Sequence, residues 1–114
     1  MANSRVDLLQ GTLDMLILQT LNEGKKHGYA IVRHIQSVTN EVLSVEEGSL
    51  YPALHRMEGK GWIVSEWGLS ENNRRAKYYQ LTRSGRKQLE EQVLTWERFA
   101  EATAKVLGLS GRGS

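Results

Sequence analysis

The sequence predicts a mainly α-helical domain that carries one small antiparallel β-hairpin. Apolar residues recur every three or four positions in several segments, which is the period of an amphipathic helix. Two runs rich in β-forming residues, 62 to 67 and 76 to 81, flank a segment of Gly, Ser and Asn, which is the pattern of a hairpin. With 114 residues and no cysteine, we expect a single domain without disulfide bonds.

Three helices are expected before the hairpin. The first covers about 9 to 23, and Gly24 follows as a stop signal. The second covers about 28 to 38. The third is predicted to begin with Ser49 as its N-cap, so that Pro52, the only proline, lies in the first turn. A proline there loses no hydrogen bond, because the first amides of a helix have no internal partner.

The hairpin and one long helix complete the predicted fold. Ile63, Tyr79 and Leu81 are the expected inward side chains of the two strands. The last helix is expected to begin at 82 or 84 and to end near 107. Three helices followed by a twisted hairpin are typical of the winged helix-turn-helix architecture. We expect a winged-helix DNA-binding domain over 1 to 81, a C-terminal dimerisation helix of the same compact unit over 82 to 107, and a flexible tail over 108 to 114.

Basic residues are concentrated in one part of the chain. The net charge of the chain is only +2, but the segment from position 55 to position 87 contains eight Lys and Arg residues and only three Glu residues. A concentrated basic surface is the electrostatic signature of phosphate binding. The alternative interpretation is a solvated charged face.

The outer face of the third helix is predicted to read DNA once its leucines face the core. His55 and Arg56 are expected to reach base edges in the major groove, since arginine commonly binds guanine there. Ser49 and Tyr51 can donate to phosphates, and Pro52 allows a close approach of the backbone.

The predicted hairpin tip is also basic. Arg74, Arg75 and Lys77 lie within NNRRAK, at the tip and on the return strand. Such a wing can lie over the flanking backbone or the minor groove of DNA. The alternative is a tip that only aids solubility.

A heptad pattern along the last helix predicts a homodimer. Its apolar or small positions step by four and three residues, as in a coiled coil, and the short domain offers little else to cover them. They are Leu89, Val93, Trp96, Ala100, Thr103 and Leu107. Leu9, Leu13 and Leu16 of the first helix are expected to contact the partner as well. The alternative is that the stripe packs entirely within one chain.

No pattern of residues predicts an enzyme, a metal site or a cofactor. His27 and His34 could share a helix face, but no carboxylate completes a set of metal ligands. The sequence has neither a nucleophile motif nor a phosphate-binding glycine loop. It also has no run of eighteen apolar residues and no visible signal peptide, so we expect a cytoplasmic protein without a membrane partner.

Three segments resemble the PadR family of bacterial transcriptional regulators. They are HGY at 27 to 29, GSLYPALHRMEGKGWI at 48 to 63, and RRAKYYQLTRSGRKQL at 74 to 89. The resemblance implies a winged-helix homodimer of the compact branch, with one C-terminal helix. It also implies a repressor that binds double-stranded DNA at a near-palindromic operator. The remaining alternative is a winged-helix protein-interaction module that has lost DNA binding.

The resemblance also implies roles for individual residues. Tyr29 of HGY is placed among the DNA-binding residues, and His27 is expected to make a structural hydrogen bond at the start of the second helix. Some family members release DNA when they bind a small aromatic compound. Trp96 matches an interface position that lines such a cavity, and Phe99 lies beside it. A small aromatic effector is therefore a further expected partner.

Overall fold

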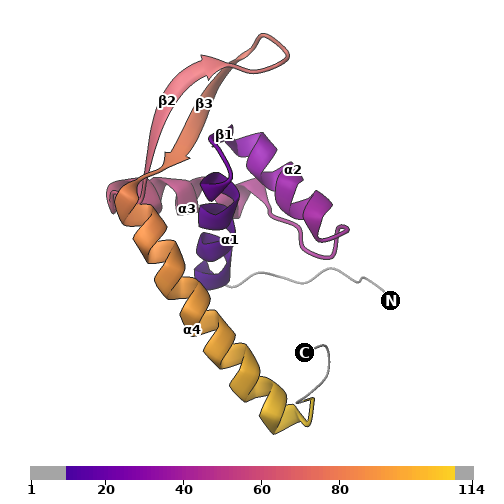
Figure 1. Ribbon diagram of the computed structural model, residues 1–114. Helices are drawn as coiled ribbons and strands as arrows, with labels where there is room; N and C mark the ends of the chain where they lie inside the picture. The colour runs from indigo at the N-terminus through magenta and orange to yellow at the C-terminus, as the bar shows by residue number, and fades with distance from the viewer. Residues whose placement is uncertain (1–9, 110–114) are drawn as a thin grey trace.

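The computed structural model describes residues 10–109, a helical body from which a hairpin and a long helix project in different directions (Figure 1). The elements are α1 (Gln10–Asn22), β1 (Lys26–His27), α2 (Gly28–Val38), α3 (Glu47–Gly59), β2 (Ile63–Leu69), β3 (Arg75–Leu81) and α4 (Arg83–Leu107). The predicted winged helix-turn-helix fold is therefore confirmed. Leu9 and residues 110–114 of the predicted tail lie outside the described residues.

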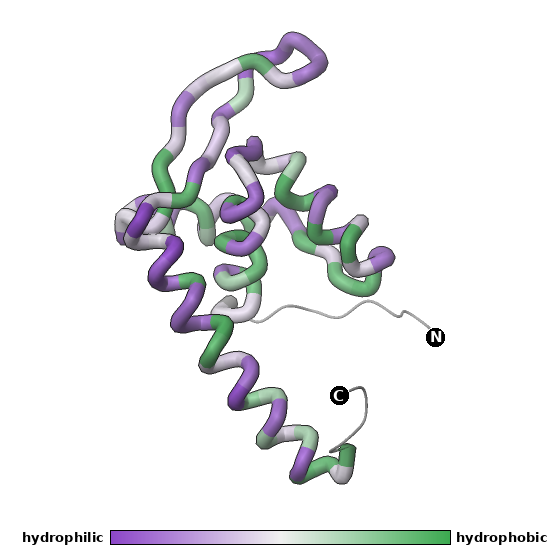
Figure 2. Tube along the Cα trace, viewed as in Figure 1, coloured by the Kyte–Doolittle hydropathy of each residue, from purple (hydrophilic) through white to green (hydrophobic). Residues whose placement is uncertain are grey.

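The hydrophobic core lies where α1, α2, α3 and the base of the hairpin meet. The predicted inward residues of α3 and of the hairpin are all buried, and Figure 2 shows the alternation of apolar and polar residues along these elements. The side chains that are at most 1% exposed are Ile17, Leu18, Ile31, Leu50, Leu54, Met57 and Ile63. These seven side chains fix the three helices against the sheet, mainly by the hydrophobic effect.

The sheet has three strands rather than the two that were predicted. Its order is β1-β3-β2, and both pairs are antiparallel. β1 is only two residues long, and it pairs Lys26 with Tyr79 and His27 with Tyr78. A two-residue strand has no periodicity of its own. The wing is thereby joined to the residues that precede α2.

The hairpin is longer than predicted. β2 and β3 each have seven residues, and the turn is confined to 70–74. Ser70 N–H donates to the Arg74 carbonyl at 2.8 Å, and Asn73 N–H donates to the Ser70 carbonyl at 2.8 Å. Asn73 has a φ of 61°, a left-handed conformation that asparagine tolerates better than most residues.

The predicted start of α3 is wrong. The helix begins at Glu47 with Glu46 as its N-cap, and no side chain caps it. Pro52 therefore lies inside the helix and cannot donate to the Gly48 carbonyl one turn earlier. The helix continues through this position because four side chains of α3, Leu50, Ala53, Leu54 and Met57, are held in the core.

The start of α4 is fixed to the base of the wing. Gly85 N–H donates to the hydroxyl oxygen of Thr82, the N-cap, at 3.0 Å. The same hydroxyl donates to the Gly61 carbonyl at 2.7 Å, and Thr82 N–H donates to the Trp62 carbonyl at 3.0 Å. From this junction α4 runs past α1 and away from the body (Figure 1).

Candidate nucleic-acid interface

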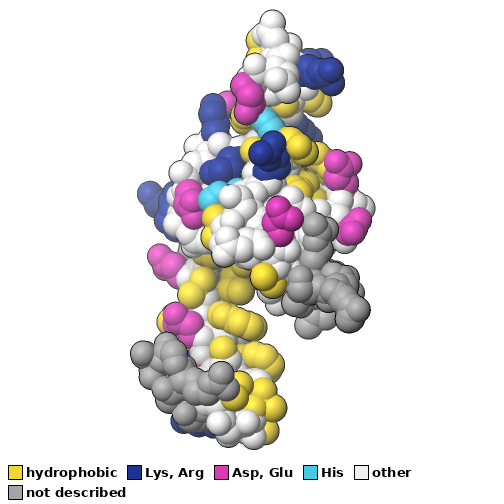
Figure 3. Space-filling model, turned by 90° about the vertical axis from the view of Figure 1, so that its right-hand side faces the viewer, with side chains coloured by type: hydrophobic (Ala, Val, Ile, Leu, Met, Phe, Trp, Pro, Cys, Tyr) yellow, Lys and Arg dark blue, Asp and Glu magenta, His cyan; other side chains and the backbone are white. Residues whose placement is uncertain are grey.

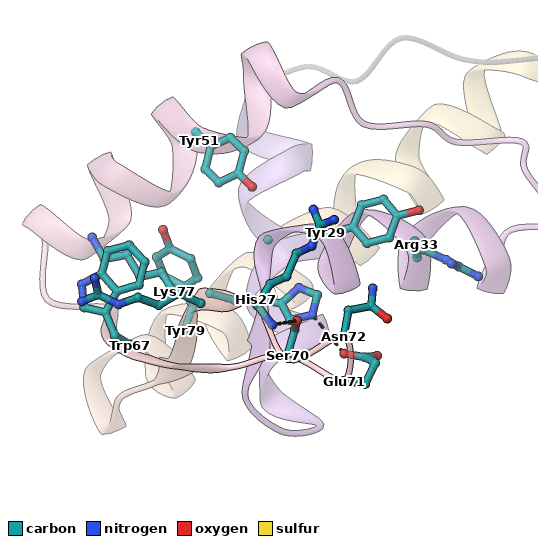
Figure 4. A pocket seen from close by; sticks show the side chains of 14 residues that line it. His27, Tyr29, Arg33, Tyr51, Trp67, Ser70, Glu71, Asn72, Lys77 and Tyr79 are labelled. Carbon is teal, nitrogen blue, oxygen red and sulfur yellow. Dashed lines mark hydrogen bonds and ion pairs between the residues drawn. The ribbon is translucent and has the colours of Figure 1, made fainter.

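A hollow of about 830 Å³ separates the inner face of the wing from α2 and α3. Tyr51 enters it from α3 and Tyr29 from the start of α2, while Trp67 and Lys77 lie on the wing opposite them (Figure 4). The hollow therefore combines aromatic rings and cations from every element that the sequence associated with DNA. This combination suits a phosphodiester backbone with its sugars and bases.

The outer face of α3 is open to solvent, as predicted. Ser49, Pro52 and His55 are exposed, and the Tyr51 side chain is 46% exposed. The phenol of Tyr51 passes close to Gly28, where an added Cβ would lie 2.6 Å from its oxygen. Glycine before Tyr29 therefore allows α3 to place the Tyr51 hydroxyl at the start of α2.

Arg56 does not lie free on the outer face. Its Nη2 donates to Asp14 Oδ1 of α1 at 2.5 Å, and the Asp14 side chain is only 9% exposed. This bond uses one of the three guanidinium nitrogens and restricts the directions in which the side chain can point. Arg56 therefore connects α3 to α1, and its expected contact with a base stays a prediction.

We expect Asp14→Asn to lower the free energy of unfolding by about 2 kcal/mol. The change leaves the Arg56 guanidinium without its charged partner, and the partial exposure of Arg56 reduces the loss below that of a fully buried pair. Urea unfolding followed by circular dichroism, at a fixed protein concentration, measures the effect. Asp14→Asn combined with Arg56→Gln should recover part of the loss. Equal stability of Asp14→Asn and wild type would contradict the role of this ion pair.

Three cations line the wing in the places that the sequence predicted. Arg74 is exposed at the tip, Arg75 is exposed at the start of β3, and Lys77 is half-buried on the same strand. The guanidinium carbon of Arg75 lies 4.5 Å from the centroid of the Trp67 ring. The wing therefore presents its positive charge toward the same hollow as Tyr51.

His27 joins the wing tip to the start of α2. Ala30 N–H donates to His27 Nδ1 at 3.2 Å, which confirms the expected hydrogen bond and leaves Nε2 to carry the proton of the neutral ring. Nε2 lies 3.6 Å from Glu71 Oε1 at the tip. A backbone hydrogen bond and His27 together hold the pKa of the Glu71 carboxyl below its ordinary value of 4.5. A carboxyl pKa that is lower in the folded state stabilises the folded tip at pH values above 4.5. This stabilisation is lost as the pH falls and Glu71 becomes protonated.

Two lining residues of the hollow were missed by the sequence reasoning. Trp67 was predicted to lie in a strand but was given no role in binding. Arg33 was not considered, and its guanidinium carbon lies 5.6 Å from the centroid of the Tyr29 ring. Strand alternation could have identified Trp67, because it lies on the same face as the inward Ile63. No signal in the sequence pointed to Arg33.

A second surface runs along α1 and α4. Trp96 and Phe99 have ring centroids 6.1 Å apart and are 45% and 62% exposed. Val106 and Leu107 are exposed farther along the helix, and Figure 3 shows hydrophobic side chains gathered along this part of the molecule. Together these four residues leave a large apolar surface uncovered in one chain.

The predicted interface residues closer to the body differ in burial. Leu13 and Leu89 are each 4% exposed and belong to the core of one chain, which leaves little of either side chain for a partner. The side chains of Leu16, Val93, Ala100 and Thr103 are half-buried. The stripe therefore packs against the core as far as Val93, and beyond it Trp96 and Leu107 are exposed while Ala100 and Thr103 are partly covered.

A cavity of about 570 Å³ lies beside this surface, between α1 and α4. Met15, Trp96 and Phe99 form its apolar walls, and Glu91 is the only charged residue in its lining within residues 10–109. The side-chain oxygen of Gln92, which also lines it, is buried and has no hydrogen-bond partner among the described residues. A molecule that offers an N–H or O–H donor would satisfy that oxygen.

Searches for other kinds of site give a negative result over residues 10–109. No three His, Asp or Glu side chains in this range lie together in a way that could hold a metal ion. None of the helices in it has the length and apolar character needed to cross a membrane.

Comparison with known proteins gives consistent results. The model of the transcriptional regulator PadR-like family matches residues 17–91. Uncharacterized protein X of Lysinibacillus sphaericus is 33% identical over 97 residues, which are 85% of this chain and 89% of that protein. A transcriptional regulator from Clostridium thermocellum has a similar structure, with 34% identity, a TM-score of 0.75, and coverage of 94% of this chain and 100% of that chain. A PadR-like transcriptional regulator from Bacillus cereus has 28% identity, a TM-score of 0.74, and coverage of 93% and 97%.

Proposed function

The chain belongs to the PadR-like family of transcriptional regulators, and we propose that it is a homodimeric repressor that binds a near-palindromic operator in the bacterial cytoplasm. As a member of this family it is a DNA-binding regulator and not an enzyme. The proposal concerns its assembly, its binding surface and its control.

One observation supports the binding surface above all others. Tyr51 of α3 and the cations of the wing line the same hollow, so α3 and the wing contribute to one surface. In this proposal His55 and the start of α3 enter the major groove, and the wing binds the flanking strand. The proposed DNA-binding residues are Tyr29, Ser49, Tyr51, Pro52, His55, Arg56, Arg74, Arg75 and Lys77.

The exposed apolar surface of α4 supports the homodimer. Trp96, Phe99, Val106 and Leu107 would be covered by the same residues of a second copy, as a two-fold axis requires. Such a dimer presents two α3 helices to one side of a duplex. Their separation would have to match one DNA turn, roughly 34 Å.

The cavity beside α4 supports control by a small aromatic effector. Trp96 and Phe99 supply ring surfaces, and Glu91 and the Gln92 oxygen supply acceptors. Among the described residues no cation lines the cavity. We therefore favour a flat neutral or cationic molecule with a hydrogen-bond donor over an aromatic carboxylate. Quenching of tryptophan fluorescence by such compounds, absent in Trp96→Phe, would support this part of the proposal.

A salt titration of duplex binding tests the function. We expect Arg74→Ala to weaken binding to specific and random duplexes alike, and to reduce the log–log salt slope by about 0.9, because one phosphate contact is lost. Arg98→Ala is the matched control, since it removes the same charge from the part of α4 that lies away from the wing. Fluorescence anisotropy with a labelled duplex from the region upstream of the gene provides the measurement.

The possible results separate the two functions under consideration. Steep salt dependence that Arg74→Ala reduces and Arg98→Ala does not supports DNA binding through the wing. If the wild-type protein binds no duplex even at low ionic strength, DNA binding is excluded and the protein-interaction module becomes the better hypothesis.

A further inference from the structure

We propose that Trp67 is a positioning residue for DNA binding, and that its ring holds Arg75 and Lys77 in place to bind two successive phosphates of one strand. This inference rests on the proposed function, because the proposed function assigns Arg75 and Lys77 of the wing to DNA binding. Trp67 does not itself bind the DNA in this account. Its role is to fix the directions of two flexible cations.

The pairing of the strands places the three side chains on one face. Trp67 lies directly opposite Lys77, and Arg75 is the next residue of β3 on that face. The Arg75 guanidinium carbon lies 4.5 Å from the ring centroid, and Lys77 Nζ lies 6.0 Å from it. Both cations therefore lie within the range of a cation–π interaction with a single indole.

The ring of Trp67 is not packed into the hydrophobic core. Trp67 is 59% exposed, although its neighbours toward the base on the same face, Ile63 and Tyr79, are buried. The inner face thus changes along the wing from core residues to one aromatic ring with two cations. Because single exposed apolar side chains are common on protein surfaces, the inference depends on the two cations beside the ring and not on the exposure alone.

The charges on the two faces of the wing differ. The inner face carries no carboxylate on either strand, because the one acid of β2, Glu66, lies on the outer face and pairs with Lys25 at 3.2 Å. The cations on the inner face are therefore not neutralised by the strands that carry them. They face the hollow that Tyr51 enters from α3.

The spacing of the cations fits a phosphate backbone. Residues two apart on a strand are separated by about 6.7 Å, comparable to the distance between neighbouring phosphates along one DNA strand. Arginine and lysine side chains otherwise lose considerable rotamer entropy when they bind. Stacking on Trp67 restricts them before DNA arrives, so less entropy is lost on binding.

A double-mutant cycle tests the proposal by duplex affinity across a range of salt concentrations. We expect Trp67→Leu to weaken binding about three- to tenfold, and to reduce the salt slope by about 0.9 to 1.8. Trp67→Phe, which keeps a weaker ring, should lie between Trp67→Leu and wild type. In an Arg75→Gln background, Trp67→Leu should have a clearly smaller effect, because one of the cations that it positions is already absent.

Val64→Ala is the matched control. Val64 is 52% exposed on the outer face of the same strand, and its truncation should change affinity by no more than about twofold and leave the salt slope unchanged. Thermal unfolding of each variant checks that the folded domain is retained. The exposure of Trp67 predicts only a small change in Tm for Trp67→Leu.

The remaining outcomes distinguish a failure of this inference from a failure of the proposed function. If Trp67→Leu binds like wild type while wild type binds DNA normally, this inference is wrong and the proposed function stands. If the effects of Trp67→Leu and Arg75→Gln multiply in full, the ring contacts DNA directly and the positioning role is wrong. If wild type binds no duplex, the proposed function fails and this inference fails with it.

Discussion

Replacing Gly85 with alanine is expected to lower the free energy of unfolding by about 3 kcal/mol, because the added methyl group would overlap the backbone of the wing base. An added Cβ would lie 2.0 Å from the Trp62 carbonyl oxygen and 2.8 Å from Leu81 Cδ1. The oxygen belongs to the backbone and already accepts from Thr82 N–H, so it cannot move away without breaking the junction between the wing and α4. Urea unfolding at a fixed protein concentration measures the loss.

Gly59→Ala is the matched control for Gly85→Ala. Gly59 ends α3, and within the described residues no atom outside its own stretch of helix lies within 4 Å of the position of an added Cβ. Alanine there should raise stability by less than about 1 kcal/mol, since glycine is the poorer helix former. If both variants unfold at the same urea concentration, the close packing at Gly85 has no energetic importance and the junction is looser than described.

Phe99→Glu is expected to separate the proposed dimer and to weaken operator binding by about a hundredfold or more. Phe99 is 62% exposed beside Trp96, where two copies would bring two like charges into an apolar interface. Each separated chain would hold only one half-site and would lose the advantage of binding both halves together. Sedimentation velocity reports the assembly state, and anisotropy compares a full operator with a single half-site.

Arg98→Glu controls for the change of charge on α4. At 100° per residue, Arg98 lies on the side of the helix opposite Trp96 and Leu107. This variant should remain dimeric and bind the full operator much as wild type does. A dimeric Phe99→Glu protein would show that the interface lies elsewhere, and a monomeric wild type that binds the full operator tightly would refute the dimer.

Much of the fold could be predicted because its signals are local. The bounds of α2 agree with the prediction, and α4 begins within the predicted range and ends at the predicted residue. The buried positions of Leu50, Leu54 and Ile63 also agree. β1 was missed because two residues form a strand only through Tyr78 and Tyr79, which are distant in sequence. The start of α3 was misplaced because Glu46 begins the helix through its backbone alone.

The candidate site was less predictable, because it depends on which side chains meet across elements. Exposure of His55 and Tyr51 follows from helical periodicity. The ion pair between Arg56 and Asp14 does not follow from periodicity, since their contact depends on how α3 crosses α1. The cation that a sequence pattern favoured for reading bases thus also connects α3 to α1. Trp67, which no DNA-binding pattern identified, lies within cation–π distance of both Arg75 and Lys77.

The junction at Thr82 has a mechanical consequence. The helix that starts there has 25 residues and is about 37 Å long, and its first turn is hydrogen-bonded to the base of the wing. The helix therefore acts as a stiff lever arm, with the wing at one end and Trp96 and Phe99 beyond its midpoint. A tilt of about 5° around its far end would displace the wing base by about 3 Å. A small molecule that changed the packing angle near Trp96 would need no contact with the wing to alter how it meets DNA.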